Sequence, residues 1–159
     1  MTHGMQRLAK MLATAGGLIL CATILMTCLS VALRELGVGP IPGDYELVQA
    51  GVGFAIFAFL PWCHITHGHA SVDIFAQKLP AGFQHWFGVV VDCAFAAVII
   101  LITWRMGAGL VSKYGYGETT FILGYPIWWA YAGAMVGAVA ASITAVYVAV
   151  AGPMARAEQ

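Results

Sequence analysis

Residues 11–33 decide the fold of this chain: MLATAGGLILCATILMTCLSVAL contains no charged side chain. A helix needs about 20 consecutive, mostly apolar residues to cross the hydrocarbon layer of a bilayer. The stretch is therefore predicted to be a membrane-spanning helix. It is longer than the apolar region of a secretory signal peptide, and no A-x-A cleavage pattern follows it, so we expect it to stay in the mature protein.

Three further stretches have the same character, at about 45–63, 86–106 and 127–151. Together with the first they predict an all-α membrane protein with four transmembrane helices, forming a single membrane domain over residues 1–159. The tryptophans agree with these limits, because an amphipathic ring favours the boundary between lipid and water. All five lie at the ends of expected helices: Trp62, Trp86, Trp104, Trp128 and Trp129.

The composition excludes several classes of protein. Apolar residues make up 61% of the chain and charged residues 9%, where about 25% charged is ordinary, so the chain lacks the polar residues that a soluble surface needs. The net charge is zero and no run of basic residues occurs, which argues against nucleic-acid binding. The four cysteines form no CxxC pair, and we expect buried thiols rather than disulfides or a zinc site.

An even number of spans places both termini on one side of the membrane. Basic residues favour the cytoplasmic side; Arg7 and Lys10 precede the first span, whereas Arg34 after it is offset by Glu35. We therefore expect both termini in the cytoplasm. This orientation leaves three basic residues outside: Arg34, Arg105 and Lys113.

The second and third connections contain apolar residues that bear on their expected structure. In the second, Val72, Phe75, Ala76 and Leu79 follow helical spacing, which predicts a short amphipathic helix lying in the membrane plane over about 71–80. Pro80 would end this helix. In the third connection, we expect the apolar residues 121–123 to enter the membrane interface or to contact another protein.

Glu46 opens the second span, where an ionisable group needs a partner. It begins a narrow stripe of polar and small residues at helical spacing that continues with Gln49, Ala50 and Gly53. One interpretation is an interfacial carboxylate beside a helix-packing surface. The other is an ion pair with Arg34 or Arg105 that joins the outer ends of the helices.

Asp92 is the second acidic residue expected within a span, about 9 Å along the third helix and close to its inner end. The nearest expected partner is a histidine of the second connection, or Lys78. A structural hydrogen bond, a contact with another subunit and a proton or ion path remain open as roles.

The fourth span carries the small residues Gly133, Gly137 and Ala141, each four positions apart. Such spacing lets two helix backbones approach closely. We expect this motif to pack against another span rather than to form a binding pocket.

Histidines gather after the second span as His64, His67 and His69, with His85 further on. A b-type haem could be imagined between His64 and His85, and a metal ion between His67, His69 and Asp73. We favour a third interpretation, in which these histidines lie at the water boundary and bond the connection. No cofactor or metal is therefore expected.

The sequence offers no nucleophile–base pair, no glycine-rich phosphate loop and no paired carboxylates, so an enzyme is not predicted. It also shows no internal repeat and no broken helices, which many carriers possess. A transporter acting by itself is therefore not indicated.

A motif of the form G-H-x-x-V-D follows the second span and ends in Leu-Pro; its residues are Gly68, His69, Val72, Asp73, Leu79 and Pro80. This pattern resembles the small membrane subunit (Q subunit) of tripartite ATP-independent periplasmic (TRAP) transporters. Glu46 and the segment 118–129, ETTFILGYPIWW, resemble the same family, and the likeness extends from about Asp44 to the end of the fourth span. Ser71 is a departure, since the family often has a basic residue there.

The resemblance implies a scaffold in the bacterial inner membrane that does not bind substrate. Such a subunit forms a heterodimer with a large membrane subunit, which moves sodium and substrate, usually an organic acid, delivered by a periplasmic binding protein. The residues Gly68, His69, Val72, Asp73 and Pro80 would then form a structural and assembly motif. Within it, His69 and Asp73 would fix the turn into the in-plane helix, with Asp73 capping its first turn.

Two alternatives from other classes remain. The chain could be a haem- or quinone-binding membrane anchor of a redox complex, which an absorption spectrum would reveal. It could also be a self-assembling channel or carrier, which would show flux in vesicles without a second subunit.

Overall fold

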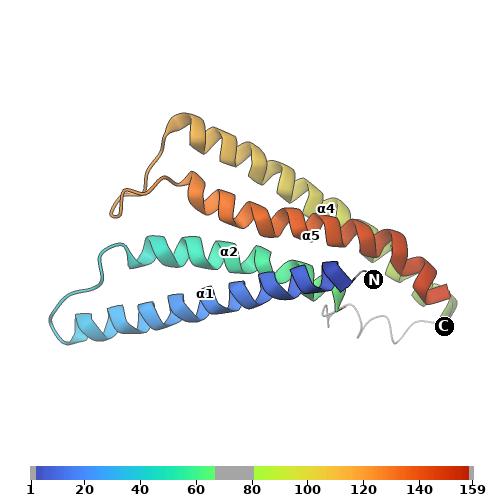
Figure 1. Ribbon diagram of the computed structural model, residues 1–159, viewed down its shortest axis with the longest axis horizontal. Coiled ribbons are helices and arrows are strands. Elements are labelled where there is room, and N and C mark those ends of the chain that lie inside the picture. The colour runs from blue at the N-terminus through green and yellow to red at the C-terminus, as the bar shows by residue number, and fades with distance from the viewer. Residues whose placement is uncertain (1–2, 67–80, 158–159) are drawn as a thin grey trace.

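The computed structural model describes residues 3–66 and 81–157, and four long helices make up most of this part of the chain (Figure 1). They are α1 (His3–Glu35), α2 (Asp44–Ile65), α4 (Ala81–Tyr116) and α5 (Trp128–Ala157). Each is long and apolar enough to cross a membrane, as the sequence predicts. The in-plane helix expected over 71–80 and the five motif residues from Gly68 to Pro80 lie outside the described residues.

Helix α4 is longer than the span expected at 86–106, because it continues to Tyr116. The expected span covers the apolar run and ends beside Arg105, but arginine is a good helix former, so this charged residue does not end the helix. No proline interrupts the following turns, and the helix ends where Gly117 adopts a left-handed conformation with φ 61°. Arg105, expected in the outer connection, therefore lies within the helix.

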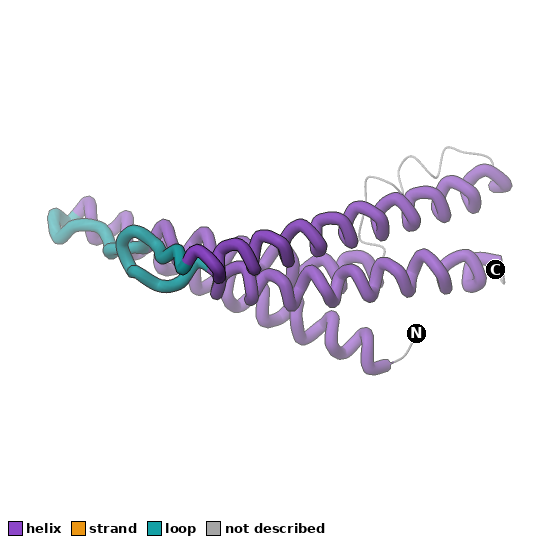
Figure 2. Tube along the Cα trace, turned by 90° about the horizontal axis from the view of Figure 1, so that it is seen from above, coloured by secondary structure: helices purple, strands orange, loops and turns teal. Residues whose placement is uncertain are grey.

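The helices form an open layer in the order α1, α2, α5, α4 (Figures 1 and 2). Helix α1 is antiparallel to α2 and α4 is antiparallel to α5, whereas the two central helices, α2 and α5, run parallel (Figure 1). Helix α1 approaches α5 only slightly, and within the described residues the backbones of α1 and α2 make no close approach to α4. The connections 36–43 and 117–127 lie together at one end, called the loop end below, and both termini lie at the other (Figure 1). The two outer helices, α1 and α4, each keep a broad outer face.

The distribution of side chains is that of a membrane protein. Small residues such as Ala58, Ala138 and Ala145 are fully buried, whereas Leu18 and Leu25 are at least 70% exposed. In a soluble protein the large apolar side chains are the ones removed from water. Here lipid can solvate them, so the interior is left to small residues that let helices approach.

Close approach is most evident between α2 and α5. A Cβ atom added to Gly137 would lie 2.6 Å from the carbonyl carbon of Phe57, and one added to Gly133 would lie 3.6 Å from the Phe54 ring. We call this contact the α2–α5 seam. A similar contact joins α1 to α2, where a Cβ on Gly16 would lie 3.0 Å from that of Ala58.

Candidate functional site

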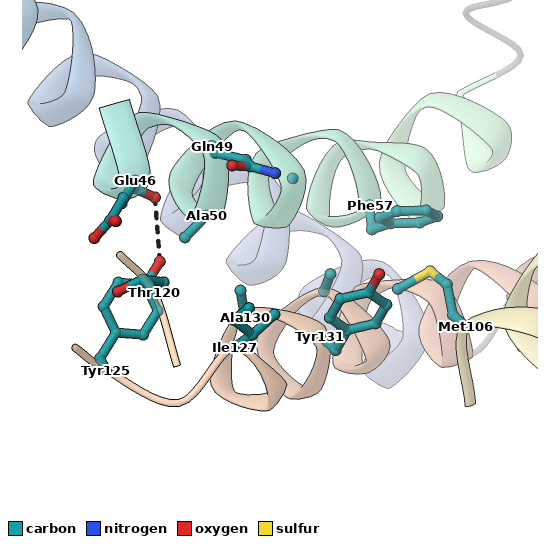
Figure 3. Close-up of a pocket in the computed structure, with 12 residues that line it drawn as sticks. Glu46, Gln49, Ala50, Phe57, Met106, Thr120, Tyr125, Ile127, Ala130 and Tyr131 are labelled. Carbon is teal, nitrogen blue, oxygen red and sulfur yellow. Dashed lines mark hydrogen bonds between the residues drawn. The ribbon is translucent and has the colours of Figure 1, made fainter. Parts of the chain in front are cut away.

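The site begins with Glu46, whose side chain is buried in the first turn of α2. Its two carboxylate oxygens accept hydrogen bonds from the backbone N–H groups of Ile122 at 2.8 Å and Leu123 at 3.0 Å. The Tyr125 hydroxyl donates to the Glu46 backbone carbonyl at 3.1 Å, and the Thr120 side chain lies beside the carboxylate (Figure 3). Glu46 therefore fastens the connection between α4 and α5 onto α2.

This arrangement replaces the ion pair with Arg34 or Arg105 that was one of the two expectations for Glu46. Both arginines are exposed, and the structure shows no ion pair between either one and Glu46. The physical reason is that each carboxylate oxygen of Glu46 already accepts a hydrogen bond from a backbone N–H group. Hydrogen bonds to an ionised carboxylate are strong, so the buried charge is stabilised without an arginine.

The fastened segment, residues 118–127, folds back on itself as a tight hairpin. Thr120 N–H donates to Tyr125 O at 2.9 Å, and Ile127 N–H donates to Glu118 O at 3.0 Å. Lys113 at the end of α4 forms an ion pair with Glu118. Partial burial, and secondarily the negative charge of Glu46, raise the pKa of Tyr125, so its hydroxyl stays a donor. The hairpin therefore holds its shape while Phe121 at its tip is fully exposed.

A second polar contact ties α1 to α2 at the same end. The Ser30 hydroxyl donates to the Asp44 carboxylate and accepts the Ile41 N–H at 3.1 Å, while Asp44 also accepts the Tyr45 N–H at 2.7 Å. The sequence analysis missed Ser30 and Asp44. The available signal was the position of Asp44 in the first turn of a helix, where acidic residues are favoured.

The stripe of Glu46, Gln49, Ala50 and Gly53 lines one wall of a cavity of about 330 Å³ between α2, α5 and α4 (Figure 3). Tyr131 and Met106 contribute to the opposite wall. Glu46 is the one charged residue among the residues lining it, and its carboxylate already holds the hairpin. The cavity thus presents an apolar wall without a free charged group for catalysis.

The opposite end of the layer contains His64 and Asp92. The His64 side chain is 3% exposed, and its ring stacks on Phe95 of α4 with centroids 4.3 Å apart. Asp92 is also buried, one helical turn before Phe95. The partners expected for Asp92 in the second connection, Lys78 among them, lie outside the described residues, so its role stays a prediction.

Most of the residues considered as haem or metal ligands lie outside the described part of the structure. His67, His69 and Asp73 lie among residues 67–80, and nothing is described of the His85 side chain. The described residues contain no cluster of three metal-binding side chains. His64 is placed as a packing residue between α2 and α4.

The small residues of α5 lie where helices meet. Gly133 and Gly137 form the α2–α5 seam, and Ala141 is buried in a cluster with Ala96 and Ile99 of α4. Thr103 and Ser142 add a hydroxyl contact of 2.9 Å between α4 and α5.

The tryptophans divide into two groups. Trp128 and Trp129 begin α5 at the loop end, where Tyr114 contacts Trp128 edge-on, and Trp62 is half-buried near the end of α2. Trp104, expected at a helix end, lies well inside α4 because this helix runs on to Tyr116. The Trp86 side chain lies outside the described residues.

Comparisons with known proteins give one match. A family model described as "Tripartite ATP-independent periplasmic transporters, DctQ component" matches residues 23–153. Neither a search of curated proteins nor a search of solved structures gave a match. The matched range includes all of α2 and α4, α5 except its last four residues, the second part of α1 from residue 23, and both connections of the loop end.

Proposed function

The chain belongs to the DctQ component family of tripartite ATP-independent periplasmic transporters, and from that premise we propose that it is the small scaffold subunit of a sodium-coupled transporter for organic acids. In this role it forms a heterodimer with the large membrane subunit. The large subunit moves the substrate, which a periplasmic binding protein delivers.

The uses of the buried polar groups support a structural role. Glu46 and Asp44 bind backbone N–H groups, and Ser30 joins α1 to α2. These contacts stabilise the layer, and they engage the carboxylate of Glu46, the one charged residue that lines the cavity. The layer also keeps two broad outer faces, on α1 and on α4, and either one offers a surface on which a larger membrane protein can rest.

The proposed orientation has both termini in the cytoplasm of the bacterial cell. The loop end, with the fastened hairpin and its exposed tip Phe121, then faces the periplasm, where the binding protein arrives. The motif of Gly68, His69, Val72, Asp73 and Pro80 would lie on the cytoplasmic side and fix the depth of the layer in the interface.

Co-expression with the large subunit tests this proposal. A tag on this chain should recover the large subunit from solubilised bacterial membranes, and uptake of labelled organic acids should stop when this chain is omitted. Asp73→Ala should lower the recovery of the large subunit, whereas Ser71→Ala, two residues away, should not. Uptake that continues at full rate without this chain would show that it is not part of the transporter.

A further inference from the structure

Arg105 is a charged residue of α4 whose depth can be read from its neighbours. Two residues before it, the Thr103 hydroxyl contacts Ser142 of α5 at 2.9 Å. Two residues after it, a Cβ on Gly107 would lie 3.2 Å from the Met135 side chain. Arg105 is therefore level with the stretch between Met135 and Ser142.

This stretch lies midway along the membrane-crossing helices. The membrane-crossing part of α5 is Trp128–Val150, and Met135 to Ser142 lie at its centre. Gly137, in the same stretch, touches Phe57, which is near the middle of α2. Tyr114 contacts Trp128 at the loop end. Measured along α4, Arg105 is about 13 Å from Tyr114 and about 20 Å from Asp92.

The side chain of Arg105 points away from the rest of the chain. It shares a helical face with Val98 and Leu101, seven and four residues earlier, which are 56% and 53% exposed. Ala96 and Ile99 lie on the opposite face and pack on α5. Among the described residues the structure shows no ion pair for Arg105, and the ion pair that it shows joins Lys113 to Glu118.

A guanidinium exposed at this depth would face hydrocarbon in an isolated chain. Charged side chains within a bilayer are costly and almost always pair inside a protein assembly. A second copy of this chain offers no suitable acid among its described residues, because Asp92 is buried and Glu46 is occupied. The remaining described acids lie at the loop end: Glu35, Asp44 and Glu118.

We propose that the outer face of α4 around Arg105 docks on a membrane-spanning helix of the large subunit that presents an aspartate or glutamate at the same depth. This inference rests on the proposed function, since it names where the large subunit binds. An arginine can bond a carboxylate through two parallel N–H···O contacts. The pair would fix both the depth and the rotation of the two subunits relative to each other.

The test compares variants of the tagged chain co-expressed with the large subunit. Arg105→Leu should lower the recovery of the large subunit at least about tenfold, because it leaves the partner carboxylate unpaired in the membrane. Arg105→Lys, which keeps the charge, should lose much less. Arg34→Leu is the matched control and should have no effect, since Arg34 is exposed at the end of α1.

Two further measurements separate a loss of docking from a loss of folding. The amount of each variant in membranes without the large subunit should not fall, since leucine is more apolar than arginine. A photo-crosslinker at Leu101 should capture the large subunit, whereas one at Leu25 on the outer face of α1 should not.

The outcomes separate the two proposals. If wild type and Arg105→Leu recover the large subunit equally, or if Leu101 crosslinks only to lipid or to a second copy of this chain, the docking face is wrong and the scaffold role stands. If wild type itself recovers no large subunit, both proposals fall.

Discussion

The α2–α5 seam and the loop end hold the molecule together by different means. At the seam, Gly137 lies against the backbone of Phe57, and the contact depends on shape alone. At the loop end, the carboxylates of Glu46 and Asp44 accept hydrogen bonds from backbone N–H groups. Lipid tails are as apolar as leucine, so helices gain little in the bilayer from simple burial. Close packing of small residues therefore stabilises the helix contacts within the membrane, and hydrogen bonds stabilise the loop end at its boundary with water.

The seam should be the more sensitive of the two regions. Gly137→Leu places a side chain where a Cβ alone would be 2.6 Å from the Phe57 backbone, so we expect a loss of about 3 kcal/mol or failure to fold. Thermal unfolding in detergent measures this loss. Gly53→Leu is the matched control, because a Cβ at Gly53 meets nothing within 4 Å; equal losses for both variants would contradict the close-fit explanation.

The next largest effect is expected at the loop end. Glu46→Ala removes the acceptor of two backbone N–H groups, and we expect a loss of about 2–3 kcal/mol confined to the hairpin. Hydrogen exchange at the Ile122 and Leu123 amides should rise. Glu35→Ala, at an exposed position near the end of α1, should change neither amide. Unchanged protection at Ile122 in Glu46→Ala would mean that the carboxylate does not hold the hairpin.

The contact between α1 and α2 should be weaker. Ser30→Ala leaves the Ile41 N–H without its acceptor, while Asp44 keeps its contact with the Tyr45 N–H. We expect a loss of about 1–2 kcal/mol and faster exchange of the Ile41 amide. Ser112→Ala, on the exposed face of α4, provides the control, and the prediction fails if the two serine variants are equally stable.

The smallest effect is expected between α4 and α5, where a polar contact lies within a closely packed helix interface. Thr103 and Ser142 exchange a hydroxyl contact within the membrane, and the Thr103 hydroxyl also reaches the Ala138 carbonyl at 3.2 Å. Interhelical hydrogen bonds of this kind contribute about 0.6 kcal/mol on average. A double-mutant cycle of Thr103→Val and Ser142→Ala should give a coupling energy of that size. A coupling energy of several kcal/mol would mean that hydrogen bonds, rather than close packing, are the main stabilisation between α4 and α5.

The sequence predicted the helices well because the signal for a span is local: a run of apolar residues of sufficient length. The full length of α4 was harder to predict, because a membrane span gives no signal for how far its helix continues beyond the apolar run. The expected span covers 86–106, and the helix runs on to Tyr116, so Trp104 and Arg105 lie within the helix and not at its end.

The site was predictable only in part. A buried acid in the first turn of a span needs a partner, so Glu46 could be singled out from the sequence. Its partners are backbone groups of Ile122 and Leu123, more than seventy residues away, and no side-chain pattern marks a backbone donor. The small residues of α5 indicated a packing surface, but the choice of α2 as the partner of Gly137 depends on the tertiary arrangement.

The most direct measurement of the scaffold role is sodium-driven uptake in vesicles. The chain is reconstituted alone, and together with the large subunit and the binding protein, and labelled organic acids are supplied outside. The role predicts no uptake by the chain alone, and uptake by the complete set that is lost when the chain is left out. Uptake by the chain alone would contradict it.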